Sequence, residues 1–82
     1  MTYIEELLTV LSEECAEVIQ SASKIKRFGM DANNLKVFAK ELGDLQCMIN
    51  MCQEADLITW SEIEEQVEMK REKLKVYSEH LK

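Results

Sequence analysis

The sequence contains no proline, only two glycines and a single histidine in its 82 residues. Proline and glycine are the residues that interrupt helices most strongly, so their scarcity favours long uninterrupted helices. The single histidine excludes a ferritin-like di-iron bundle, because that site needs a Glu-x-x-His motif on each of two helices. With 46% hydrophobic and 32% charged residues, the chain is typical of a globular helical protein.

The sequence also lacks a CxxC pair and a long apolar run. Its three cysteines, Cys15, Cys47 and Cys52, are predicted to be reduced thiols in the core of a cytosolic protein. No apolar run approaches the roughly 18 residues of a membrane span, and no basic segment with an apolar run precedes the domain. We therefore expect a soluble cytoplasmic protein that is neither secreted nor bound to a membrane.

Acidic residues outnumber basic ones, with 16 Asp and Glu against 10 Lys and Arg, and the net charge is −6. Contacts to a nucleic-acid duplex need clustered Lys and Arg, so a duplex is not an expected partner. An acidic chain is compatible with a carboxylate site that recruits divalent cations. Residues 1–82 are expected to form a single domain, which at this length buries only about 60 to 65% of its unfolded surface. Self-association would increase that burial.

The first helix is predicted from its capping signals. Thr2 and Glu5 have the spacing of a capping box, and the apolar pattern that follows runs to about Arg27. Gly29 is suited to end this helix. The next helix is predicted to cover about residues 35 to 54, with Asp31, Asn33 or Asn34 as its N-cap.

A third helix is predicted to start at a second capping box, formed by Thr59 and Glu62, and to reach about residue 80. Within the second helix, Gly43 costs about 1 kcal/mol relative to alanine and suggests close backbone packing. The fold class is therefore all-α, with an antiparallel helical hairpin plus a third helix. We expect this chain to complete a four-helix-type bundle by oligomerisation, as a homodimer or a homotetramer.

The stretch Val37–Cys52 combines apolar residues around most of a helix with two acids, Glu41 and Asp44, on the apolar side. An unpaired carboxylate in such a place costs several kcal/mol, so each acid needs a cation, a metal or a proton. On the first helix, Glu14 and Glu17 edge the apolar face in the same way.

These four acids form two pairs with i, i+3 spacing, which puts each pair on one face of its helix. Four carboxylates from two packed helices could meet at one point and hold Mg²⁺, Mn²⁺ or Ca²⁺. The alternative is that they are core-edge acids in ion pairs with lysine or arginine. The candidate partners are Lys24, Arg27, Lys70 and Lys73. The same spacing recurs on the third helix in Glu62, Glu65 and Glu68, where we predict a solvated face.

Three segments together resemble the MazG-like, all-α nucleoside triphosphate pyrophosphohydrolase superfamily. They are Glu13–Gln20, Ser23–Gly29 and Lys40–Leu45. That family is marked by EExxE followed, a few tens of residues on, by ExxD, and here 23 residues separate Glu17 from Glu41. The resemblance covers essentially the whole chain, which is similar to short phage or bacterial members.

The resemblance implies Mg²⁺-dependent hydrolysis of (d)NTP to (d)NMP and pyrophosphate, with Mn²⁺ able to replace Mg²⁺. It implies that the metal-binding and catalytic residues are Glu14, Glu17, Glu41 and Asp44. One of these acids, or an acid beside them, would take the proton of the attacking water. The candidate substrate-binding residues are Lys24, Arg27, Lys70 and Lys73 for the phosphates and Asn50 for a base or sugar edge.

A non-catalytic protein is the rival hypothesis. The chain would then be an acidic helical interaction protein whose core-edge acids are held by lysines, or one that binds nucleotide without cleaving it. Such a protein would gain little stability from millimolar Mg²⁺, whereas a ligand that binds only the native state raises its stability.

Overall fold

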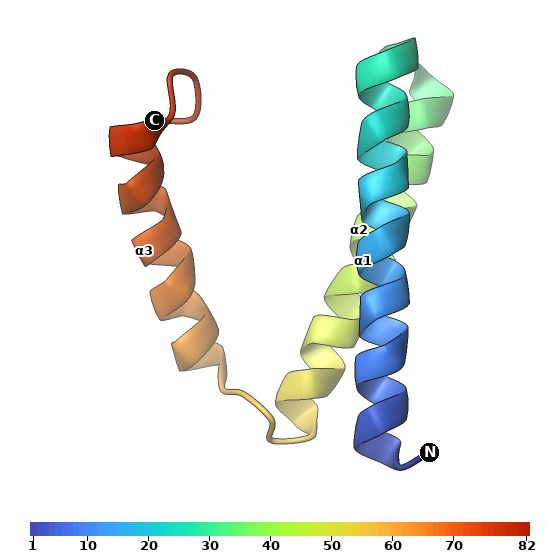
Figure 1. The fold of residues 1–82 in the computed structure, drawn as a ribbon, viewed down its shortest axis with the longest axis vertical. Helices are drawn as coiled ribbons and strands as arrows, with labels where there is room; N and C mark the ends of the chain where they lie inside the picture. Colours follow the sequence, from blue (N-terminus) through green and yellow to red (C-terminus); the bar gives the residue numbers. More distant parts are fainter. The chain divides into compact units, whose positions relative to one another are not determined.

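The computed structural model describes all 82 residues and contains three α-helices and no strands. The helices are α1 (Tyr3–Phe28), α2 (Ala32–Glu54) and α3 (Trp60–Tyr77) (Figure 1). The predicted all-α class is confirmed. None of the three helices combines the length and the apolar content that a bilayer span requires.

The chain divides into two compact units, Met1–Cys52 and Gln53–Lys82. The first unit contains α1 and nearly all of α2, and the second contains α3 with the link that precedes it.

In the first unit, α1 begins as its sequence predicts. The Thr2 hydroxyl accepts a hydrogen bond from the Glu5 backbone N–H at 3.1 Å, and the Glu5 carboxylate accepts one from the Thr2 N–H at 3.4 Å. The helix ends at Gly29, whose N–H donates to the Ile25 carbonyl at 2.9 Å. Gly29 has φ +103°, a conformation that residues with a side chain rarely adopt.

The turn between α1 and α2 places the start of α2 at Ala32, three residues before the predicted residue 35. Asp31 caps the helix, because its Oδ1 accepts a hydrogen bond from the Asn34 N–H at 2.8 Å. The Asn34 side chain donates to the Gly29 carbonyl at 3.1 Å and to Asp31 Oδ2 at 3.2 Å. These bonds tie the two helix ends to each other.

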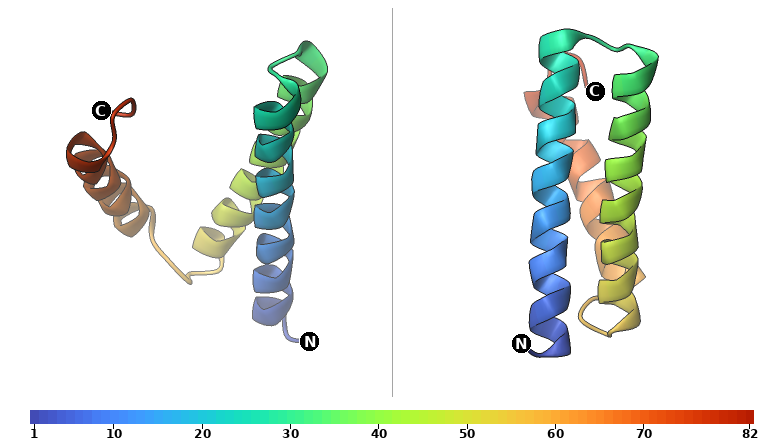
Figure 2. Two further views of the ribbon diagram at one scale, coloured as in Figure 1. Left: turned by 45° about the horizontal axis from the view of Figure 1, so that its top comes forward. Right: turned by 90° about the vertical axis from the view of Figure 1, so that its right-hand side faces the viewer.

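The two helices of the first unit run antiparallel and lie side by side, so they form the predicted hairpin (Figure 2). The buried apolar side chains are few: Leu7, Met48 and Cys52. Many large apolar side chains of the hairpin are more than a third exposed: Leu8, Ile19, Leu35, Val37 and Leu42 are examples. The hairpin therefore covers only part of the apolar surface that α1 and α2 present.

Two expectations about the interior are wrong for this chain. All three cysteines are free thiols, but only Cys52 is buried, and Cys15 and Cys47 are exposed. Gly43 does not mark a close approach of backbones, because a Cβ added there would meet nothing within 4 Å. It lies on the polar side of α2, where no packing demand explains the glycine.

In the second unit, Thr59 caps α3 with a second capping box, completed by Glu62. The helix ends at Tyr77 rather than near residue 80, because Ser78 turns to an extended conformation with ψ 140°. Its hydroxyl then accepts a hydrogen bond from the Leu81 N–H at 2.9 Å. No residue of α3 is buried, and its apolar side chains Val67 and Met69 are more than a third exposed in the single chain.

Candidate metal centre

The hairpin brings acids from both of its helices to one place. Glu14 lies midway along α1, while Glu41 and Asp44 lie one turn apart on α2. One carboxylate oxygen of each residue lies within 4.8 Å of the others. We call these three residues the acidic cluster. The predicted convergence of the two helices is therefore present for three of the four candidate ligands.

The acidic cluster is partly shielded from water. Glu41 is buried, Glu14 is intermediate, and the Asp44 side chain is 42% exposed. Burial and the negative charges of Asp44 and Glu41 raise the pKa of the Glu14 carboxyl above its usual value. Three carboxylates that oppose one another in this way favour either a proton or a cation among them.

Lys40 supplies one positive charge beside the cluster. Its Nζ lies 2.8 Å from Asp44 Oδ2 and 3.6 Å from Glu41 Oε1. The hydrogen bond to Asp44 and the charges of Asp44 and Glu41 raise the pKa of the Lys40 ammonium group. Lys40 is not among the residues that the sequence predicted for the site. Its i, i+4 spacing to Asp44 was the available signal.

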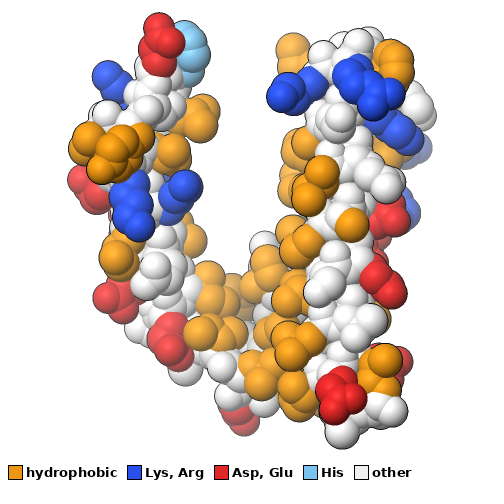
Figure 3. All heavy atoms as spheres, in the orientation of Figure 1, with side chains coloured by type: hydrophobic (Ala, Val, Ile, Leu, Met, Phe, Trp, Pro, Cys, Tyr) orange, Lys and Arg blue, Asp and Glu red, His pale blue; other side chains and the backbone are white.

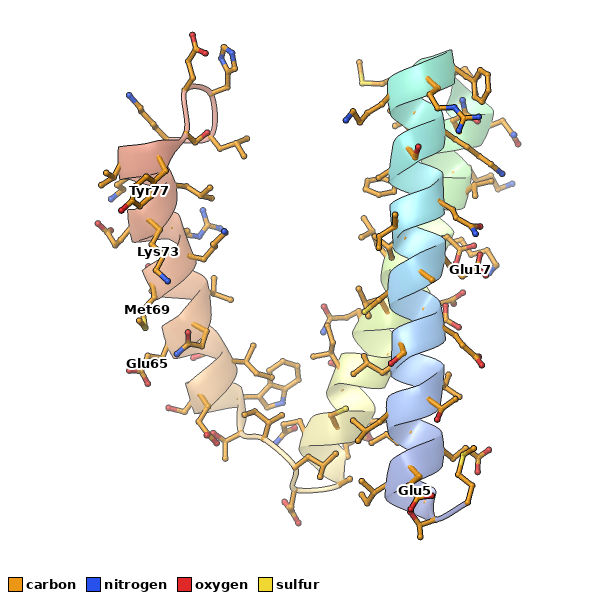
Figure 4. All side chains as sticks on the ribbon, viewed as in Figure 1. Glu5, Glu17, Glu65, Met69, Lys73 and Tyr77 are labelled. Carbon is orange, nitrogen blue, oxygen red and sulfur yellow. The ribbon has the colours of Figure 1, made fainter.

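Glu17, the fourth candidate ligand, does not belong to the acidic cluster. It is exposed on the flank of α1, one turn beyond Glu14 (Figure 4). Its charge nevertheless contributes to the raised pKa of Glu14, although less than those of Asp44 and Glu41.

A groove is lined by residues from both helices of the hairpin. It has a volume of about 310 Å³ and is lined by Tyr3, Glu6, Leu7, Val10, Met48 and Met51. Val10 precedes Glu14 by four residues and Met48 follows Asp44 by four, so both lie about one helical turn from the acids. The acids and the groove residues follow 3-4-3 spacing on α2 (Glu41, Asp44, Met48 and Met51) and 4-3-4 spacing on α1 (Tyr3, Leu7, Val10 and Glu14).

The cationic candidates on α1 lie toward the other end of the hairpin. Lys and Arg side chains gather at the end where α1 meets α2 (Figure 3). Lys24 is ten residues beyond Glu14, a rise of about 15 Å along the helix. Arg27 lies further on, with its guanidinium carbon 5.0 Å from the centre of the Phe28 ring. Neither residue contacts the acidic cluster.

The remaining candidates are also outside the cluster. The Asn50 side-chain oxygen accepts a hydrogen bond from Gln46 Nε2 at 2.9 Å, about two turns past Asp44. Lys70 and Lys73 are exposed on α3, in the second unit. The acids of α3 that share the ExxE spacing, Glu62, Glu65 and Glu68, are exposed as predicted.

The chemistry of the cluster fits a hard divalent cation. Its donors are carboxylate oxygens alone, with no nitrogen or sulfur among them. Such a set suits Mg²⁺, Mn²⁺ or Ca²⁺ better than the softer transition metals. Burial and the mutual repulsion of the carboxylates raise the pKa of Glu14, and a cation among the three groups would relieve the repulsion.

Comparison with models of protein families, with curated proteins and with solved structures found no match to this chain.

Proposed function

We propose that the protein is a Mg²⁺-dependent nucleoside triphosphate pyrophosphohydrolase that cleaves (d)NTP to (d)NMP and pyrophosphate. The observation that carries the proposal is the acidic cluster, in which Glu14 from α1 approaches Glu41 and Asp44 from α2 within 4.8 Å. The same three acids belong to the EExxE and ExxD motifs on which the resemblance to MazG-like hydrolases rests.

In this proposal Glu14, Glu41 and Asp44 hold Mg²⁺, with Glu17 as the fourth ligand that the motif implies. When bound, Mg²⁺ would offset the charge of the phosphate oxygens and make a water molecule more acidic. A carboxylate of the site would accept the proton of the water that attacks the α-phosphorus, and pyrophosphate would leave.

Other residues would bind the rest of the substrate. Within the hairpin, Lys24 and Arg27 are the proposed contacts for the triphosphate, and Asn50 for a base or sugar edge. The groove beside the acidic cluster offers apolar walls from Val10 and Met48, which suit the flat face of a nucleobase.

We further propose that the protein forms a homo-oligomer that completes a helical bundle. The apolar face of α2 extends around most of the helix, and α1 alone does not cover it. Leu35, Val37 and Leu42 are therefore more than a third exposed. A second copy would cover these side chains. Sedimentation at micromolar concentration should give a dimer or a tetramer, and a folded, active monomer would overturn this part of the proposal.

The experiment that tests the function is pyrophosphate release from a panel of NTPs and dNTPs, with and without Mg²⁺. Chromatography identifies the nucleotide product. We expect monophosphate and pyrophosphate, formed only when the metal is present. No turnover of any nucleotide by the folded, Mg²⁺-supplied protein would contradict the proposal and favour a binding module.

A further inference from the structure

Lys40 is the only cationic side chain that forms ion pairs with the acidic cluster. Its ammonium group hydrogen-bonds to Asp44 Oδ2 at 2.8 Å and lies 3.6 Å from Glu41 Oε1. With all three carboxylates ionised, Lys40 reduces their summed charge from −3 to −2. The cluster therefore already contains one cation, supplied by the chain itself.

We propose that Lys40 is a built-in counter-ion that a divalent cation must displace from Asp44, so that this lysine lowers the cation affinity of the cluster. The inference rests on the metal site of the proposed function. Unlike the motif acids, Lys40 does not bind the metal. It competes with the metal for the Asp44 carboxylate.

The geometry allows this displacement at small cost. The Lys40 side chain is 67% exposed, so its flexible stem can turn toward water without opening the hairpin. An ion pair this exposed holds its partners weakly. A divalent cation brings twice the charge and can contact oxygens from all three acids, whereas the ammonium group reaches only the two on α2.

The simpler role for Lys40 is helix support, because Lys40 and Asp44 form an i, i+4 pair on α2. That role predicts a slightly less stable protein on removal of the lysine and no tighter binding of metal. If Lys40 competes with the metal, removing the lysine should make metal binding tighter. A direct measurement of metal affinity therefore distinguishes the two roles.

The test is titration of the full chain with Mn²⁺ alone, in which electron paramagnetic resonance counts the free ion and no nucleotide is present. Lys40→Met removes the charge with a side chain of similar length. Lys36→Met is the matched control, because it makes the same change one turn earlier on α2, where Lys36 forms no ion pair. Lys40→Arg keeps the charge. Circular dichroism checks that each variant is folded.

We expect Lys40→Met to bind Mn²⁺ roughly three- to tenfold more tightly than the wild type, because one positive charge no longer opposes the ion. Lys36→Met and Lys40→Arg should stay within about twofold of the wild type. Unchanged or weaker binding by folded Lys40→Met would overturn the inference while leaving the metal site of the wild type in place.

The outcome also separates the inference from the proposed function. Binding by Lys40→Met but not by the wild type would support the counter-ion role and count against the wild type as a Mg²⁺ enzyme. Absence of Mn²⁺ binding in both proteins would overturn the two proposals together.

Discussion

The hairpin and α3 begin with the same local signals but differ in what they bury. Both α1 and α3 start with a complete capping box, in Thr2 and Glu5 and in Thr59 and Glu62. The hairpin buries Leu7 and Met48, whereas α3 has no buried residue. Capping depends on four consecutive residues, while burial depends on a neighbouring helix. Local sequence therefore determines where α1 and α3 begin, and packing against a neighbouring helix determines which of their side chains are buried.

The acids of the hairpin and of α3 also differ in their surroundings. Glu62, Glu65 and Glu68 on α3 repeat the spacing of Glu14 and Glu17 on α1, yet the only metal-capable cluster joins α1 to α2. Acids on a single solvated helix repel one another and face water. A site arises where a second helix brings carboxylates from the opposite side.

The largest expected difference between the hairpin and α3 is the effect of an acid substitution on activity. Glu41→Gln removes a buried charge of the cluster at nearly constant volume, and it should lower turnover by at least about 100-fold with the helical circular dichroism intact. Pyrophosphate release measures the rate. Glu65→Gln makes the same change on α3 and should leave the rate unchanged. Near wild-type turnover by Glu41→Gln would remove this residue from the site.

Stability should show the next largest difference. Met48→Ala in the hairpin removes a side chain that is only 8% exposed and should lower the free energy of unfolding by about 2 to 5 kcal/mol. Met69→Ala on α3 truncates a side chain that is 44% exposed and should cost less than about 1 kcal/mol. Urea denaturation measures both. Equal losses would mean that α3 buries Met69 against a partner.

A smaller change tests the open side of α2. Gly43→Ala should raise the free energy of unfolding by about 0.5 to 1 kcal/mol, because alanine favours the helix and its Cβ has free space. The same substitution at Gly29 should destabilise the protein, since Gly29 has φ +103°. Thermal melts compare the two. A loss of stability at Gly43 would reveal a neighbour against that side of α2.

The smallest expected effect is the pH dependence that Glu14 contributes. Its folded pKa lies above the usual 4.5, so ionised Glu14 opposes folding above this range. Without metal, the unfavourable contribution of Glu14 to the stability of the folded protein should disappear as the pH falls from above the raised pKa to below 4.5. Glu14→Gln should therefore gain stability over the wild type at neutral pH and lose that advantage in acid. An advantage that does not vary with pH would exclude the titration of Glu14 as its cause.

The sequence was sufficient for the starts of α1 and α3 and for three of the four acids predicted to converge, whereas α2 begins three residues before its predicted start and Glu17 lies outside the cluster. Thr2, Thr59 and the acids Glu14, Glu41 and Asp44 follow from capping chemistry and from helical periodicity, which are local. The ion pair of Lys40 was missed, because a helical wheel gives a direction and not the reach of a long side chain. The exposure of Cys15 and Cys47 was missed because the wheel shows which face is apolar but not how much of it a single neighbour covers.

The turn at Gly29–Asp31 has a consequence for the order of events during synthesis. It joins α1 to α2 through three residues, so the contacts between Glu14 and Glu41 need only a short connection to close. A hairpin of such local contacts forms in microseconds, whereas the ribosome adds about 5 to 20 residues each second. All three acids of the cluster lie in the first unit, so the cluster can close within microseconds once both helices have left the ribosome, without contacts from α3.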